Sequence, residues 1–249
     1  DAPVGAMYMH ARSSTRFFDP ASQTAKYYRQ LEKAFPDDSV VLTSATRDGK
    51  LLLAQVWSDR NPGDFYLYDT VAKKVEPVFS RRQWFDPTRL AATRSVDIAA
   101  RDVLGLHGYL TLPLGKQPGT PLPLVLLPHG GPFGIFDDWW FDDEVQMLAE
   151  AGYAVLRVNH RGSGNYGRGF YESGAKQWGR TLQDDLTDAT RWAIAQNIAD
   201  PRRICIYGAS YGGYAALMGV AKEPDLYRCA VGYVGVYDLE AMHREDSRD

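Results

Sequence analysis

Short apolar runs separated by polar turns dominate the first third of the chain. Residues 1–35 read as polar loop followed by a short helical pattern. After them the alternation and the turn residues predict strands at residues 40–45, 51–57, 65–68 and 75–79. Turn sequences such as Asp48-Gly49 and Asn61-Pro62-Gly63 favour antiparallel pairing. Four such strands make one propeller blade, and a closed propeller needs at least four blades. We therefore expect residues 1–90 to be the C-terminal portion of a β-propeller, about one blade with part of another, and a connector.

The pattern changes near residue 90 to strands that alternate with helices. Residues 94–100 and 106–112 read as an antiparallel pair. Strands are then predicted at residues 122–127, 153–158, 203–207 and 229–234, and helices at residues 140–151, 181–196 and 211–220. Apolar strands alternating with helices are typical of a mostly parallel α/β sheet that is buried on both faces. We expect residues 91–249 to form such a doubly wound sheet.

Composition excludes several classes of partner. The 249 residues are 45% hydrophobic and 24% charged, with a net charge of −3 and both signs interspersed. Neither a nucleic acid nor an anionic membrane surface is favoured. No apolar run reaches the roughly 18 residues of a membrane span. The chain begins Asp1-Ala2-Pro3, without a leader, so the compartment stays open between the cytoplasm and, after removal of a signal peptide, the periplasm or the exterior.

Two cysteines, Cys205 and Cys229, fall in strands predicted to be buried. We expect them to be small core side chains rather than a disulfide. No histidine pair accompanies them, so they do not predict a zinc site. The sequence indicates neither a metal nor an organic cofactor.

A serine motif lies at the junction of a predicted strand and a predicted helix. Gly208-Ala209-Ser210-Tyr211-Gly212 matches G-x-S-x-G, the nucleophile elbow that exposes a serine at the end of a strand. A serine that attacks a carbonyl needs N–H donors aimed at the oxyanion that forms. One donor would be the backbone N–H of Tyr211. The other would come from the loop after an earlier strand, where His129-Gly130-Gly131-Pro132 stands.

These two motifs, with Arg161-Gly162-Ser163-Gly164 and the blade-like strands, resemble the prolyl oligopeptidase family of serine peptidases. The resemblance covers most of the chain and is nearest to the acylaminoacyl-peptidase and dipeptidyl-peptidase branches. It implies an α/β-hydrolase domain, capped by a β-propeller, that hydrolyses short peptides or acyl-peptides through Ser210. By position, it assigns Gly131 and Tyr211 to the oxyanion hole. It also assigns Val236 and Leu239 to the pocket for the residue before the cleaved bond.

The chain departs from the family pattern after Ser210. In this fold the triad follows the order Ser, Asp, His, on loops after later strands. Positions 211–249 hold the elbow helix and only one more predicted strand. We therefore expect a chain truncated at both ends, with the catalytic Asp and His absent, little turnover by itself, and an unpaired apolar edge at its last strand. His243 lies in a charged, solvated tail and is not expected to be the base.

Other polar residues admit competing interpretations. His129 and His160 are expected to be structural, because neither fits the chain order of a triad. Arg161 either braces a loop or contacts substrate. Gly162-Ser163-Gly164-Asn165-Tyr166-Gly167 matches G-x-G-x-x-G, but a dinucleotide site would need a helix that opens within the glycines. Acidic residues follow at Asp184, Asp185 and Asp188, and we expect them to serve the dipole of their helix rather than a metal.

Two further functions remain open at this point. An esterase or lipase would share the serine elbow and the fold. A binding protein that retains the fold without catalysis would also fit the absence of the triad acid and base. The sequence does not indicate the oligomeric state.

Overall fold

The computed structural model describes residues 3–9, 11–116 and 119–246. The chain divides into two compact units. The first consists of Asp1–Ala92 together with Asp138–Gln146, and the second consists of Thr93–Asp137 and Met147–Asp249. A short segment from the middle of the sequence therefore belongs to the first unit.

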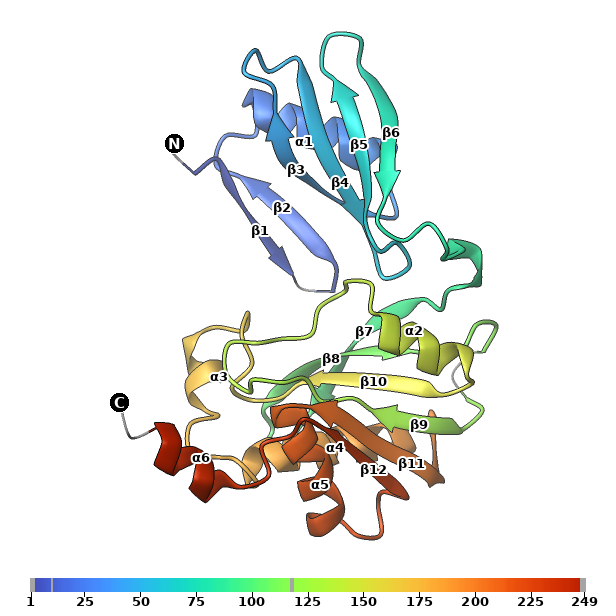
Figure 1. The fold of residues 1–249 in the computed structure, drawn as a ribbon, viewed down its shortest axis with the longest axis vertical. Coiled ribbons are helices and arrows are strands. Elements are labelled where there is room, and N and C mark those ends of the chain that lie inside the picture. The colour runs from blue at the N-terminus through green and yellow to red at the C-terminus, as the bar shows by residue number, and fades with distance from the viewer. Residues whose placement is uncertain (1–2, 10, 117–118, 247–249) are drawn as a thin grey trace. The chain divides into compact units, whose positions relative to one another are not determined.

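The first unit is built on a four-stranded antiparallel sheet (Figure 1). Its strands follow one another in the order of the sequence, and the four strand predictions are confirmed. They are β3 (Ser39–Ala45), β4 (Leu51–Trp57), β5 (Asp64–Asp69) and β6 (Lys74–Ser80). Helix α1 (Gln23–Ala34) covers this sheet, and Leu31 is buried against Val56 and Tyr68. The preceding residues form a hairpin that the sequence did not predict, of β1 (Gly5–Met9) and β2 (Ser13–Phe17).

The segment Asp138–Gln146 is held in the first unit by aromatic packing and side-chain hydrogen bonds. The ring of Trp140 stacks on Trp57 with centroids 4.3 Å apart. The buried amide of Gln146 bonds both the N–H and the C=O of Ala91, at 2.9 Å each. An ion pair joins Asp143 to Arg82. These contacts explain why nine residues remote in sequence join the first unit.

The second unit contains a six-stranded mixed sheet with the order β12-β11-β9-β10-β8-β7 (Figure 1). The strands are β7 (Thr93–Ala99), β8 (Gly105–Thr111), β9 (Leu122–Leu126), β10 (Ala154–Asn159), β11 (Ala199–Ala209) and β12 (Cys229–Tyr233). Strands β12, β11, β9 and β10 are parallel, whereas β8 is antiparallel to β10 and β7 is antiparallel to β8. This is the sheet that the alternating pattern predicted.

Helices follow the strands as expected, although their ends differ. They are α2 (Asp143–Glu150), α3 (Arg168–Glu172), α4 (Thr181–Ala195), α5 (Tyr211–Lys222) and α6 (Leu239–Asp246), and a short 3₁₀ turn, η1, spans Pro87–Arg89. Helix α6 forms in the segment that was predicted to be a charged tail. Among the described residues, no helix combines the length and the apolar character that crossing a membrane requires.

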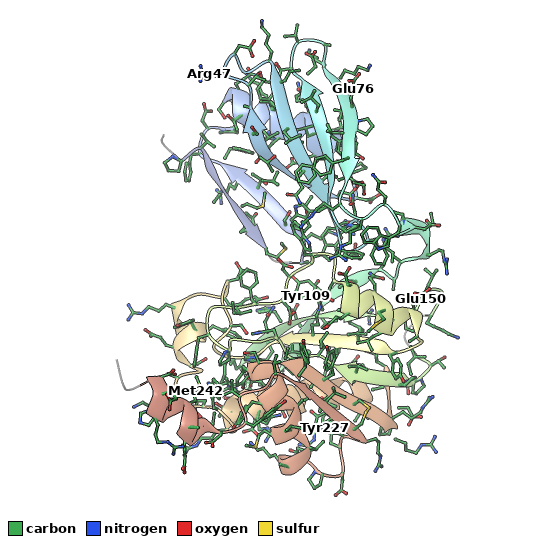
Figure 2. The ribbon with its side chains drawn as sticks, in the orientation of Figure 1. Arg47, Glu76, Tyr109, Glu150, Tyr227 and Met242 are labelled. Carbon is green, nitrogen blue, oxygen red and sulfur yellow. A yellow bond between two sulfur atoms is a disulfide. The ribbon has the colours of Figure 1, made fainter. Side chains whose placement is uncertain are left out.

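The core of the second unit lies between the sheet and helices α4 and α5. Leu182 and Leu186 of α4 pack with Leu124 and Ile206 of the sheet, all without solvent exposure. The buried Tyr227, labelled in Figure 2, joins α4 through a 3.0 Å hydrogen bond between its hydroxyl and Thr190. Because successive side chains of a strand point to opposite faces, burial of this face fixes the register of the parallel strands.

The expectation that Cys205 and Cys229 are unpaired core residues was wrong. The two residues lie directly opposite one another on the neighbouring strands β11 and β12, with Cα atoms 4.7 Å apart, and they form a disulfide. That separation lies within the range that a disulfide can span. Cys229 is also exposed, unlike the core residues of this sheet. Within the described residues β12 pairs with β11 alone, so its other edge is unpaired, as predicted for the last strand.

Candidate active site

Ser210 occupies the sharp turn between β11 and α5, as the motif predicted. Its backbone has φ 55° and ψ −121°, a conformation that strains any residue with a Cβ. Hydrogen bonds hold this conformation: the N–H of Ser210 donates to the carbonyl of Tyr233 at 3.0 Å, and its own carbonyl accepts from Tyr214 at 3.1 Å. The side chain makes no capping hydrogen bond to α5, and Ser210 is exposed. Its hydroxyl is therefore presented at the end of the strand.

The flanking glycines are required by close backbone contacts. A Cβ on Gly208 would lie only 2.6 Å from the backbone of Gly212. A Cβ on Gly212 would in turn strike the carbonyl oxygen of Pro128. The first turn of α5 can therefore pack against the start of the loop that follows β9.

The loop at residues 130–137, called here the Gly130–Asp137 loop, approaches the serine at its first residue. A Cβ built on Gly130 would lie 3.6 Å from the Cβ of Ser210, which is ordinary van der Waals contact. Gly131 follows with a φ of 112°, a conformation that favours glycine. Tyr211 is the first residue of α5, so its N–H lacks a partner within the helix. The structure thus brings Gly130 and the start of α5 close to Ser210.

The glycine-rich segment after β10 supports the Gly130–Asp137 loop. The N–H of Gly134 donates to the carbonyl of Gly162 at 3.2 Å, and the N–H of Gly164 donates to that of Ile135 at 3.0 Å. A side chain at Gly164 would strike the carbonyl oxygen of Gly134. These glycines serve the contact between two loops.

The same segment lacks the geometry of a dinucleotide site. Helix α3 begins at Arg168, after the last glycine of the motif, and it has only five residues. Asp184 and Asp185 lie on α4 rather than at the end of a strand. A dinucleotide needs a helix that opens within the glycines and an acid after the next strand.

His129 and His160 are placed in structural networks, in agreement with their predicted role. The imidazole of His129 contacts the hydroxyl of Ser163 through Nε2 at 2.9 Å and the carbonyl of Gly130 through Nδ1 at 2.7 Å. It stacks on His160, whose Nδ1 lies 2.9 Å from the carbonyl of Arg161. His160 is completely buried. Both ring nitrogens of His129 are thus engaged, whereas Nε2 of His160 is buried without a hydrogen-bond partner.

Burial lowers the pKa of His160 from 6.5 to about 3, and the neighbouring His129 adds to that effect. The folded state therefore binds fewer protons than the unfolded state between these two values, and stability falls as the pH falls through that range. We expect acidification from pH 7 to pH 5 to lower the free energy of unfolding by about 2 kcal/mol through His160 alone. Urea unfolding at both pH values measures the loss of stability. His160→Gln should remove the part of that loss that comes from His160. Equal acid sensitivity in the two proteins would contradict the assignment.

Arg161 braces the loop that follows β10, which decides between its two predicted roles. Its guanidinium bonds both carboxylate oxygens of the fully buried Asp185, at 2.7 and 2.9 Å. It also bonds both oxygens of Asp102, at 2.9 and 3.1 Å. Burial raises the pKa of Asp185 against the opposing effect of Arg161, whereas the hydrogen bonds from Arg161 lower the pKa of the more exposed Asp102. Four of the five N–H groups of the guanidinium are engaged in these bonds, which supports the bracing role.

The other acidic residues of α4 are held by cations. Asp188 pairs with Arg101 at 2.8 Å, and Asp184 pairs with Arg101 at 3.1 Å and with Lys222 at 2.8 Å. Across the described ranges no group of acidic, histidine or cysteine side chains is arranged to hold a metal ion. These carboxylates link α4 to the turn after β7 and to α5.

Val236 and Leu239 lie on the segment that returns toward the serine after β12. The N–H of Val236 donates to the carbonyl of Ser210 at 3.4 Å. Leu239 lines a shallow hollow of about 240 Å³ with Trp178, Met242, His243 and Asp246. Met242 is labelled on α6 in Figure 2. The ring of Trp178 packs edge-on against Tyr211, with centroids 4.7 Å apart, which connects the hollow to the first residue of α5.

The sequence interpretation missed two residues of this region, Trp178 and Asn159. Trp178 stands in a stretch without clear periodicity, so no sequence signal marked it. Asn159 is the last residue of β10 and is fully buried. A polar residue at the carboxyl end of a parallel strand is a recognised position for functional groups, and that rule would have singled it out.

Comparisons with known proteins agree on one family. Residues 139–248 match the prolyl oligopeptidase family. Over 239 residues the sequence is 36% identical to dipeptidyl aminopeptidase BIII of Pseudoxanthomonas mexicana, an alignment that covers 94% of this chain and 34% of that protein. Over 227 residues it is 31% identical to dipeptidyl peptidase family member 6 of Caenorhabditis elegans, covering 83% of this chain and 30% of that protein. The chain spans about a third of the length of these curated relatives.

A solved structure shows the same fold. A puromycin-hydrolysing peptidase of Mycobacterium tuberculosis superimposes with a TM-score of 0.68 and 26% identity, over 79% of this chain and 30% of that one. The mixed sheet of the second unit, with its serine elbow between β11 and α5, is that of an α/β-hydrolase. From its sequence relatives, its family match and its fold together, the chain belongs to the prolyl oligopeptidase family.

Proposed function

We propose that this chain carries the nucleophile and the oxyanion hole of a serine peptidase that cleaves short peptides or acyl-peptides. The observation that carries the proposal is the strained elbow at the exposed Ser210, beside which Gly130 leaves room for no more than a Cβ. The names of the relatives support peptides as the class of substrate.

In the proposed mechanism, the Ser210 oxygen attacks the carbonyl carbon of the scissile bond. A new C–O bond forms, the π pair moves onto the carbonyl oxygen, and the serine proton passes to a general base. The N–H groups of Tyr211 and Gly131 then stabilise the oxyanion, and the acyl-enzyme forms when the amine leaves with that proton. Water then attacks the acyl-enzyme in the same way, which releases the carboxylic acid and restores the serine. The helix dipole, whose positive end lies at the N-terminus of α5, adds to the stabilisation of the negatively charged oxyanion.

We infer that the general base, like the aspartate that orients it, lies outside residues 1–249. His129 is already bonded to Ser163 and Gly130, and burial keeps His160 neutral. A base must be able to take a proton near neutral pH and to reach the serine. The length of the relatives leaves ample room for both groups.

Substrate recognition is assigned to the segment after β12. We infer that Val236 and Leu239 border the pocket for the residue before the cleaved bond. The hollow beside Leu239 and the hydrogen bond from Val236 to Ser210 support this assignment.

We also infer that residues 1–90 are the C-terminal portion of a β-propeller, in which β3–β6 form one blade. These four antiparallel strands follow the order of the sequence, which is the order within a blade. In the full-length protein such a propeller would restrict access to short peptides.

Labelling of the full-length protein with a serine-directed fluorophosphonate tests the proposed function. We expect one adduct, mapped by peptide mass spectrometry to the segment that contains Ser210, and none in Ser210→Ala. Aminoacyl-arylamide and acyl-peptide substrates should then be hydrolysed, whether or not a simple ester is also cleaved. Labelling that persists in Ser210→Ala would refute the nucleophile, and turnover of the ester without hydrolysis of either peptide substrate would favour an esterase.

A further inference from the structure

The buried amide of Asn159 clamps one peptide unit of the Gly130–Asp137 loop. Its Oδ1 accepts from the N–H of Asp137 at 2.7 Å, and its Nδ2 donates to the carbonyl of the same residue at 2.9 Å. The second hydrogen of Nδ2 is directed to the hydroxyl of Tyr166 at 2.8 Å. These three partners use every hydrogen and the oxygen of the amide, so the orientation of the side chain is fixed.

The clamp lies at the end of the loop that is farther from Ser210. At the near end, His129 is bonded to Ser163, and a Cβ built on Gly130 would lie 3.6 Å from the Cβ of Ser210. In the middle, two backbone hydrogen bonds join the loop to Gly162 and Gly164. Asp137 is the last residue of the loop, and the next residue already belongs to the other compact unit. Asn159 therefore fixes the loop where the chain leaves the unit that contains Ser210.

The position of Asn159 separates it from the groups that react. It lies at the end of β10, on the opposite side of β9 from β11, the strand that leads to Ser210. It acts on the loop backbone rather than on a substrate. A displacement of about 1 Å in a group that positions reacting atoms can cost about 10²-fold in rate, so the exact placement of the Gly131 N–H matters.

We propose that Asn159 is a positioning residue of the oxyanion hole, which sets the placement of Gly131 by clamping the backbone of Asp137. The inference rests on the proposed function, because it assigns a role in the reaction at Ser210. It predicts that loss of the clamp weakens the stabilisation of the oxyanion and leaves ground-state binding of the substrate nearly unchanged.

Asn159→Ala in the full-length protein tests this role, with Thr190→Val as the matched control. Thr190 is equally buried in the same unit, and its hydroxyl bonds Leu186 and Tyr227 rather than the loop. We expect Asn159→Ala to lower kcat on an aminoacyl-arylamide about 10- to 100-fold, with KM within about 3-fold. Thr190→Val should keep both constants near those of the parent protein, at a temperature where both variants are folded.

A pair of inhibitors separates positioning of the oxyanion from general disorder. A peptide aldehyde forms a hemiacetal with the serine and places its oxygen in the hole, whereas the corresponding peptide alcohol has no carbonyl to be attacked. In Asn159→Ala the inhibition constant of the aldehyde should rise about as much as kcat falls, and that of the alcohol by less than about 3-fold. Hydrogen exchange of the Asp137 amide should accelerate in Asn159→Ala and not in Thr190→Val.

The outcomes distinguish the two proposals. An unchanged kcat and aldehyde affinity in Asn159→Ala, beside an active parent, would overturn the role of Asn159 alone. Equal losses for the aldehyde and the alcohol would also overturn it. A parent protein without Ser210-dependent turnover would overturn both the proposed function and this inference.

Discussion

Replacing Ser210 by glycine in the full-length protein is expected to remove peptide hydrolysis and, at the same time, to relieve backbone strain. Loss of the nucleophile in a serine hydrolase lowers kcat by about 10⁶-fold. Ser210 has φ 55° and ψ −121°, which glycine adopts without the steric cost that a Cβ imposes. We therefore expect Ser210→Gly to exceed Ser210→Ala in free energy of unfolding by about 1 kcal/mol. Steady-state kinetics and urea unfolding measure the two effects.

Ser173 provides a control, because there the glycine variant is expected to have the lower free energy of unfolding. Its backbone is helical, with φ −63° and ψ −18°, and both replacements remove the same hydrogen bond to Phe170. There the glycine variant should be the less stable of the two, by about 0.5–1 kcal/mol. If glycine is less stable than alanine at Ser210 as well, the elbow is not strained. Hydrolysis that survives in Ser210→Ala would show that another group is the nucleophile.

Replacing Asp185 by alanine is expected to destabilise the second unit by about 3–5 kcal/mol. The replacement leaves the buried guanidinium of Arg161 without its buried negative partner. The carboxylate of Asp185 is fully buried and accepts three hydrogen bonds from Arg161, including one from its backbone N–H at 2.9 Å. Asp102 is the remaining partner, and its side chain is about half exposed. Chemical unfolding followed by tryptophan fluorescence measures the loss.

The adjacent residue on α4 supplies the matched control. Asp184 also forms ion pairs, with Arg101 and Lys222, but these partners are 45% and 30% exposed. Asp184→Asn should therefore cost less than about 1 kcal/mol. Removing both members of the buried pair, in Arg161→Met with Asp185→Leu, should recover much of the stability lost in Asp185→Ala. Similar losses for the two aspartates would contradict the distinction between a buried and a surface pair.

Local sequence patterns predicted the elements that depend on local physics. The four strands of the first unit follow from alternation and from turns such as Asp48-Gly49. The elbow at Ser210 follows from small residues beside a serine at a strand-to-helix junction. The parallel sheet follows from apolar strands, such as Leu122–Leu126, that alternate with helices. In each case the signal lies within or beside the element that it specifies.

Features that depend on the pairing of distant residues were not predictable in this way. The disulfide between Cys205 and Cys229 depends on the register of β11 and β12, which no local pattern contains. The clamp by Asn159 joins residues 22 positions apart in the sequence. The β1–β2 hairpin lacks a clear apolar face, since none of its side chains is fully buried. The partners of Arg161, Asp102 and Asp185, are also distant from it in the sequence. The sequence therefore left two roles open for Arg161.

The assignment of Asp138–Gln146 to the first unit constrains any attempt to divide the protein. A shortened chain that starts at Thr93 would carry Trp139 and Phe141 without the residues that bury them, and these rings would meet water. Helix α2 cannot be assigned wholly to either half of a divided chain, since its first turn belongs to one unit and its remainder to the other. A chimera that exchanges the first unit between relatives should therefore transplant residues 138–146 together with residues 1–92, as a discontinuous cassette.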